Sequence, residues 1–182
     1  MTANFGRKKQ FARQKGFSLF ELIVVIAIIS ILAAVALDRY ARLLVDVERT
    51  SMQHDLGVLR SAVSMQVAAH FLAGDMQGLA SLVNSNPMDL LSEKPKNYLG
   101  ELSGSELEEI EEGSWYYNTD SNALIYLVTN ERYFETELVP ARGRFKIYPV
   151  YSEKKSGTEI KTYISGLRLR SIEPYQWLTD ID

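Results

Sequence analysis

A single apolar run near the N-terminus constrains this chain more than any other feature. Residues 17–37 hold 18 hydrophobic side chains in 21 positions, and the exceptions are Ser18, Glu21 and Ser30. About 20 apolar residues, each rising about 1.5 Å along a helix, cross a hydrocarbon core of roughly 30 Å. The run therefore predicts one helix that spans a membrane.

The segment before the run is basic and carries no acidic residue. Its five charged side chains are Arg7, Lys8, Lys9, Arg13 and Lys15, which gives +5. Residues 17–182 hold the other 15 basic and all 23 acidic side chains, which gives −8. Because Lys and Arg beside an apolar segment resist translocation, we expect a cytoplasmic N-terminus and an external C-terminal part. A cleaved secretory signal is the alternative, but its apolar stretch is only about 7–15 residues long.

Glu21 is the residue that fits a membrane span least, because an acidic side chain there costs about 2.5–3.5 kcal/mol. One interpretation places Glu21 close enough to the interface to stay hydrated. The other starts from the small-to-bulky junction between Gly16 and Phe17. A cut there would create an amine at Phe17, and that amine could pair with a carboxylate.

The order of these residues resembles the N-terminal cleavage and methylation motif of type IV prepilins and type II secretion pseudopilins. The matching features are a basic leader, Gly16, Phe17, Glu21 four residues later, and an unbroken apolar helix that ends in Ala33 and Ala34. The resemblance implies that a prepilin peptidase cuts after Gly16 and methylates Phe17. It also implies that Glu21 neutralises the amine of a neighbouring subunit during assembly.

The same resemblance implies a localisation and a set of partners. The precursor would cross the bacterial inner membrane once, with its head in the periplasm, and then enter a pilus or pseudopilus. Its partners would be the lipid bilayer, the prepilin peptidase, other pilin or pseudopilin subunits and an inner-membrane assembly platform.

Helical periodicity continues beyond the span. Two apolar stripes have spacings of three and four residues, the first at Tyr40, Leu44 and Val47, and the second at Met52, Leu56, Leu59, Val63, Val67 and Phe71. A polar patch at residues 48–51 separates them. Gly74 predicts the end of the helix, and an ion pair between Asp38 and Arg42 is expected at the outer edge of the span.

The rest of the chain predicts a short helix and a sheet. Residues 76–83 suit the helix, whereas aromatic, branched or alternating runs predict strands at residues 115–117, 123–128, 144–151 and 159–171. The expected fold is α+β and pilin-like, with the long helix packed on an antiparallel sheet of about four strands. Five regions follow: a cleaved leader (1–16), a transmembrane and filament-core half-helix (17–37), a periplasmic half-helix (38–73), a connection with an acidic loop (74–113) and a sheet-forming head (114–182).

The head also suggests a subtype. The hairpin over residues 115–126 resembles that of minor pilin-like proteins, including those of mannose-sensitive haemagglutinin pili. The chain has no cysteine, so it lacks the disulfide that closes the C-terminal loop of many adhesive major pilins. Together with an end at Asp182 without a glycine-rich tail, this favours a minor pilin or a pseudopilin.

The sequence predicts no enzyme, no cofactor and no metal site. His54 and His70 stand 16 residues apart without a cysteine neighbour, and no phosphate loop or nucleophile elbow occurs. Residues 101–113 carry six glutamates and no basic residue, which indicates a solvated loop. Residues 118–122 begin like a calcium loop, but the sixth position is Ala123 and the twelfth is Thr129, where such loops need Gly and Glu.

A nucleic-acid partner is also not expected. A charge of −8 repels phosphates unless a local basic patch forms, for example at Arg142, Arg144 and Lys146 or at Lys154 and Lys155. The predicted function is a structural filament subunit. The alternative from another class is a membrane-anchored periplasmic binding module that does not polymerise.

Overall fold

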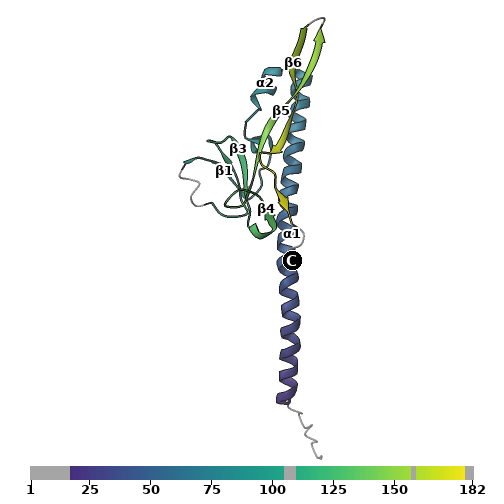
Figure 1. Ribbon diagram of the computed structural model, residues 1–182, viewed down its shortest axis with the longest axis vertical. Coiled ribbons are helices and arrows are strands. Elements are labelled where there is room, and N and C mark those ends of the chain that lie inside the picture. Colours follow the sequence, from purple (N-terminus) through teal and green to yellow (C-terminus); the bar gives the residue numbers. More distant parts are fainter. Residues whose placement is uncertain (1–16, 105–109, 157–158, 179–182) are drawn as a thin grey trace, which may run out of the picture. The chain divides into compact units, whose positions relative to one another are not determined.

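The computed structural model describes residues 17–104, 110–156 and 159–178 of the 182. The chain falls into two units, residues 1–42 and 43–182. Helix α1 (Leu19–Ala73) contributes to both units and is the longest element (Figure 1). The predicted long helix is therefore confirmed.

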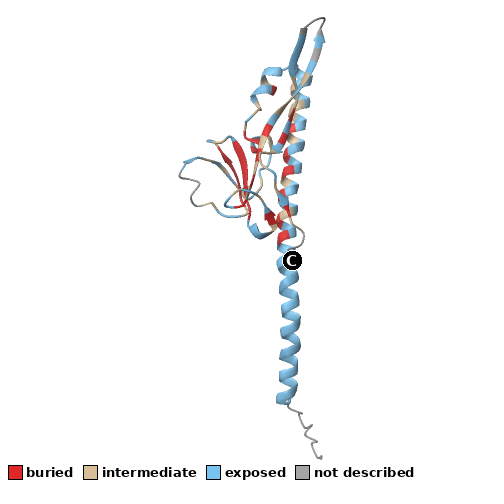
Figure 2. Ribbon diagram, viewed as in Figure 1, coloured by how far each residue is buried: buried red, intermediate tan, exposed pale blue. Residues whose placement is uncertain are grey.

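In the first unit, every described residue is exposed (Figure 2). Burial along α1 begins only at Val45, which belongs to the second unit. The apolar side chains of residues 19–42 thus have no intramolecular core to occupy, which is the pattern of a helix that meets lipid or other helices.

In the second unit, one stripe of α1 faces the sheet. Its buried members are Val45, Glu48, Met52, Leu56, Leu59 and Val63. The second predicted stripe is therefore confirmed from Met52 to Val63. Val67 is partly buried and Phe71 is exposed, so the stripe weakens toward the end of the helix.

The first stripe lies on α1 as predicted, but its members in this unit do not belong to the buried face. Leu44 and Val47 are exposed, whereas Val45 and Glu48 are buried. The physical reason is phase: steps of four and three residues back from Met52 reach Glu48 and Val45 on the same helix face. The polar character of Glu48 hid this continuity in the sequence.

The head is built on a five-stranded sheet with the order β1-β2-β3-β5-β6. The strands are β1 (Tyr98–Leu102), β2 (Trp115–Asn118), β3 (Ala123–Leu127), β5 (Arg142–Ser156) and β6 (Glu159–Ser171). The β1–β2 pair is parallel and the other three pairs are antiparallel. The four predicted strands are present, and the fold is the predicted α+β pilin-like one with a fifth strand.

Strand β1 was not predicted, because it lies in the segment expected to be a connection. Smaller elements complete the head: α2 (Met76–Ser81), the 3-10 turns η1 (Pro87–Leu90) and η3 (Glu131–Tyr133), and a two-stranded sheet of β4 (Phe134–Glu135) and β7 (Gln176–Trp177). Helix α1 ends as predicted, because Gly74 adopts a φ of +68° that suits glycine.

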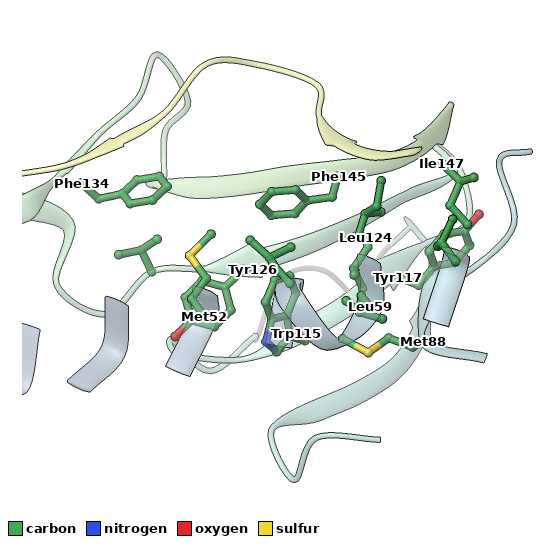
Figure 3. Packing of buried hydrophobic residues seen from close by; sticks show 14 of the residues in the cluster. Met52, Leu59, Met88, Trp115, Tyr117, Leu124, Tyr126, Phe134, Phe145 and Ile147 are labelled. Carbon is green, nitrogen blue, oxygen red and sulfur yellow. The ribbon is translucent and has the colours of Figure 1, made fainter. Parts of the chain in front are cut away.

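Large side chains fill the space between α1 and the sheet (Figure 3). Trp115 lies at the centre, with ring centroids 4.8 Å from Tyr126 and 5.8 Å from Phe145. Its indole Nε1 donates a hydrogen bond of 2.9 Å to the Asp55 carboxylate on α1. Aromatic packing and this bond together join the second half of α1 to strand β2.

A buried carboxylate makes a second connection between helix and sheet. Glu48 is only 9% exposed, yet its side chain accepts four hydrogen bonds. The donors are the Tyr126 hydroxyl (3.2 Å), the Thr129 backbone N–H (2.7 Å), and the backbone N–H (3.0 Å) and amide Nδ2 (2.6 Å) of Asn130. Burial, with the negative charge of Glu48, raises the pKa of Tyr126. Glu48 therefore fixes α1 to the end of β3 and the loop that follows.

Candidate functional site at the start of the long helix

A serine cap defines where α1 begins. The Ser18 hydroxyl accepts a hydrogen bond of 3.1 Å from the backbone N–H of Glu21, and the Ser18 carbonyl accepts one of 3.1 Å from Leu22. This is N-cap geometry, in which a side chain satisfies a donor that the first turn leaves free. The Ser-x-x-Glu pattern of residues 18–21 is the sequence signal from which this cap could be predicted.

Glu21 occupies the first turn of α1 and is exposed. In a full capping box its carboxylate would bond back to the Ser18 backbone N–H. No such bond forms, and the carboxylate has no hydrogen bond or ion pair with any residue from 17 to 104, 110 to 156 or 159 to 178. The positive end of the helix dipole favours a negative charge at this position. The Glu21 carboxylate thus lies exposed at the first turn of α1.

Phe17 directly precedes the cap and is 72% exposed. Gly16 and the predicted leader charges Arg7, Lys8, Lys9, Arg13 and Lys15 lie outside the described residues. Phe17 stands two positions before Leu19, the first residue of α1.

The surface next to this site is apolar. The large hydrophobic side chains between Leu19 and Leu44 are between 39% and 75% exposed. By length and composition, α1 can cross a membrane. Ser30 does not interrupt the apolar surface with an unsatisfied hydroxyl, because it donates a hydrogen bond of 2.7 Å to the Ile26 carbonyl.

A charged pair follows the apolar stretch. Arg42 Nε lies 3.4 Å from Asp38 Oδ2, which confirms the predicted ion pair between residues four positions apart. Such an exposed pair adds little stability. Asp38 directly follows the last residue of the apolar run, so the first strongly hydrated side chains after the run belong to this pair.

The other candidates from the sequence serve structural roles. His70 Nδ1 lies 3.1 Å from the Asp75 carboxylate, and Asp75 also caps α2 by accepting a hydrogen bond of 2.8 Å from the Gly78 N–H. These contacts, that of Gly78 first, lower the pKa of Asp75. Asn118 Oδ1 accepts bonds from the N–H and hydroxyl of Ser121, which closes the β2–β3 turn. Within the described ranges, no group of three acidic or histidine side chains could hold a metal ion.

Comparison with known proteins points to the same end of the chain. The family model described as "Prokaryotic N-terminal methylation motif" matches residues 11–37. The fimbrial protein EcpB of Eikenella corrodens is 43% identical over 58 residues, which cover 32% of this chain and 36% of EcpB. The type IV major fimbrial protein FimA of Dichelobacter nodosus is 37% identical over 62 residues, which cover 34% of this chain and 40% of FimA.

The matched segments thus span well under half of these relatives. No solved structure matches the chain at a significant level. The motif match, the fimbrial relatives and the exposed apolar helix agree with one another. In its N-terminal region, the chain is similar to the type IV pilins.

Proposed function

We propose that this protein is a structural subunit of a type IV pilus or a type II secretion pseudopilus. One observation carries the proposal: Glu21 is an exposed carboxylate, held by a capped first turn and flanked by apolar side chains, with no partner among the described residues. A charge in that setting is costly unless a partner of opposite charge meets it. The methylation motif supports the same role.

Processing would create that partner. In the proposed pathway, a prepilin peptidase cuts between Gly16 and Phe17 and methylates the new amine. The leader at residues 1–16 is then removed, and residues 17–37 form the transmembrane and filament-core half of the helix. Residues 38–73 continue it in the periplasm, residues 74–113 connect it to the head, and residues 114–182 complete the head.

Assembly would pair the Phe17 amine of one subunit with Glu21 of its neighbour. The two charges attract strongly in an apolar surrounding, and only the correct axial position brings them together. The exposed apolar side chains would first contact lipid and then other helices. An inner-membrane assembly platform is the proposed site of this transfer.

Within the family, we assign the chain to the minor pilins or pseudopilins. The cysteine-free sequence supports this assignment, since the head has no disulfide to close a C-terminal loop. The similarity of residues 115–126 to pilins of the mannose-sensitive haemagglutinin type stays a prediction. A nucleic-acid role is not proposed, because Arg144 in the candidate basic patch is already paired with Glu173.

Mass spectrometry of the native protein tests the processing step. A first residue of N-methylated Phe17 is expected. An intact leader that begins at Met1 would instead support the alternative, a membrane-anchored binding module that does not polymerise.

Glu21→Ala tests the assembly step. We expect the variant to reach the membrane and to be processed, but to be depleted at least tenfold from sheared filaments. Asp38→Asn is the matched control, because it removes an exposed acidic side chain from the same helix and should assemble normally. Normal incorporation of Glu21→Ala would contradict the proposal.

A further inference from the structure

The face of the sheet that turns away from α1 is basic along the β5–β6 hairpin. Burial alternates along both strands, since Ile147 and Leu169 belong to the core and the residues beside them do not. Successive side chains of a strand point to opposite faces, so these neighbours project away from the core. The basic and aromatic residues of this outer face are Arg142, Arg144, Lys146 and Tyr148 on β5 and Arg168 and Arg170 on β6.

At β2 and β3 a second apolar cluster lies on the same outer face. Tyr116 and Ile125 are buried in it, and Ile125 pairs in register with Arg144 on β5. Burial raises the pKa of Tyr116, and the positive charges of Arg142 and Arg144 oppose this shift. The first two basic residues of β5 thus lie beside this cluster, and the series continues onto more exposed positions of the hairpin.

Three of the cations have no anionic partner. Arg144 is paired with Glu173, whereas Lys146, Arg168 and Arg170 form no ion pair or side-chain hydrogen bond with any residue that the structure describes. Lys146 lies directly opposite Arg170 in the β5–β6 register. Like charges in such positions repel one another and destabilise a sheet. An anion from outside the chain would relieve this repulsion.

An exposed tyrosine lies among these three cations. Tyr148 is 37% exposed and pairs in register with Arg168, and Lys146 stands two positions away on the same face of β5. The face of an aromatic ring is the negative part of its quadrupole, so the C–H groups of a sugar ring pack favourably on it. We call Lys146, Tyr148, Arg168 and Arg170 the basic face. It offers charge for an anion and a ring for a sugar.

The surroundings of the basic face favour a ligand of moderate charge density. At its edge, Arg168 and Arg170 line a groove of about 540 Å³ with Arg60 of α1. Burial raises the pKa of Tyr175, which the charge of Arg60 opposes, and Tyr175 lines a pocket with the carboxylates at positions 135 and 137. Duplex DNA carries one charge per about 1.7 Å and would be repelled by such neighbouring carboxylates. A polysaccharide with one charge on each sugar meets less repulsion.

We propose that the basic face binds a polysaccharide whose sugars carry carboxylate groups. Arg168 and Arg170 project from one face about 6.6 Å apart, so each guanidinium can donate two hydrogen bonds to a separate carboxylate. Lys146 supplies a third positive charge, and Tyr148 packs against a sugar ring. The inference goes beyond the proposed function, because this face would attach the head to an acidic polymer outside the filament.

Binding to polygalacturonate tests the inference, because each sugar of this polymer carries a carboxylate. Its methyl ester has the same backbone without the charges and is the matched control ligand. Biolayer interferometry with the full-length chain in a non-ionic detergent measures both dissociation constants. We expect the ester to bind about tenfold more weakly or less, and binding of the acid to weaken with added salt. No binding of polygalacturonate, or equal binding of acid and ester, would overturn the inference.

Substitutions then locate the site. Arg168→Gln with Arg170→Gln should weaken binding of polygalacturonate about tenfold or more, because both guanidinium contacts are lost. Tyr148→Leu keeps an apolar side chain but removes the ring, and it should weaken binding about threefold. Lys96→Gln with Arg132→Gln is the matched control, since it removes two charges from exposed positions elsewhere in the head. It should change the dissociation constant by less than about twofold.

Two outcomes of these measurements would contradict the assigned site and ligand. Equal losses in the two double variants would show that only net charge matters. Tighter binding of single-stranded DNA than of polygalacturonate would replace the sugar polymer by a nucleic acid. Either result would leave the proposed filament role standing, because Glu21 lies outside the basic face.

Discussion

At the scale of single residues, the buried side chain of Glu48 holds the long helix to the sheet. It lies on the same stripe of α1 as the apolar core, and its carboxylate accepts four hydrogen bonds from residues 78 to 82 positions later in the chain. Hydrogen bonds to a charged group contribute more than neutral ones, and leaving their donors unpaired is costly. Glu48 is thus a structural residue of the head, although its sequence neighbourhood indicated only a polar surface.

Glu48→Gln should lower the free energy of unfolding of the head by about 1–3 kcal/mol. The amide nitrogen would face donors that now bond to a carboxylate oxygen. Urea unfolding of the full chain in detergent, followed by tryptophan fluorescence, measures this, because Trp115 and Trp177 are both buried in the head and are the two tryptophans of the chain.

The matched control is Asp46→Asn, which removes an exposed carboxylate two positions away on the same helix. It should change stability by less than about 0.5 kcal/mol. Equal effects of the two substitutions would show that Glu48 does not hold the helix to the sheet.

Glu173 should make the head sensitive to acid. Two hydrogen bonds from the Arg144 guanidinium lower its pKa below the ordinary value of 4.5. The ionised form therefore stabilises the fold at neutral pH, and this contribution disappears as the pH falls through the lowered pKa. Glu173→Gln should unfold at lower urea than the parent at about pH 7, and the difference should shrink by about pH 3. A difference that is independent of pH would contradict this.

At the scale of elements, the two halves of α1 differ in the burial of their side chains. Up to residue 42 every described residue is exposed, whereas from Val45 to Val63 one stripe is buried against the sheet. Helical structure is continuous across this change, and no glycine or proline occurs in it before Gly57. Its second half is stabilised by packing on the sheet, whereas the described residues of its first half have no such packing within the chain.

Gly57→Ala should stabilise the head by about 0.5–1 kcal/mol. Gly57 is exposed within α1, and an added Cβ would meet no atom within 4 Å. Gly143→Ala is the contrasting variant, since its Cβ would lie 3.0 Å from Met52 Cε and from the Phe145 ring. It should destabilise the head, by up to about 1–3 kcal/mol. Urea midpoints from the same fluorescence assay compare the two.

The elements also show what the sequence could and could not predict. The apolar run, the stop at Gly74 and the strand at residues 159–171 follow from local composition and periodicity, and each has that place in the structure. Strand β1 does not, because Tyr98-Leu99-Gly100-Glu101-Leu102 has weak strand propensity and forms by pairing with β2. The pairs β4–β7 and Glu48–Asn130 join residues more than 40 positions apart, which no local pattern reveals.

At the scale of the whole molecule, charge divides the chain into two parts. The overall value of −3 is the sum of +5 before residue 17 and −8 after it. In the proposed topology, the basic segment stays beside the anionic cytoplasmic leaflet and the acidic remainder lies on the other side of the membrane.

Isoelectric focusing should detect removal of the leader. The intact chain has an isoelectric point near 5.5. Loss of five positive charges should give the native protein a clearly more acidic isoelectric point, since N-methylation keeps the amine charged. Recombinant chain made without the peptidase is the control. A native protein that focuses with this control would contradict removal of residues 1–16.

In the proposed pathway, the cap at Ser18 bears on when the subunit leaves the bilayer. Before cleavage, Phe17 carries a neutral peptide N–H, and the first turn of α1 holds no cation. In the proposed mature chain, a positive amine stands one residue from the capped turn, at the helix end that repels cations by about 0.3–1 kcal/mol. Glu21 of a neighbouring subunit would relieve that repulsion in an apolar surrounding. Proteolysis would then raise the free energy of the subunit in the bilayer, because it creates an unpaired positive charge. Pairing of that charge in the filament would lower the free energy again.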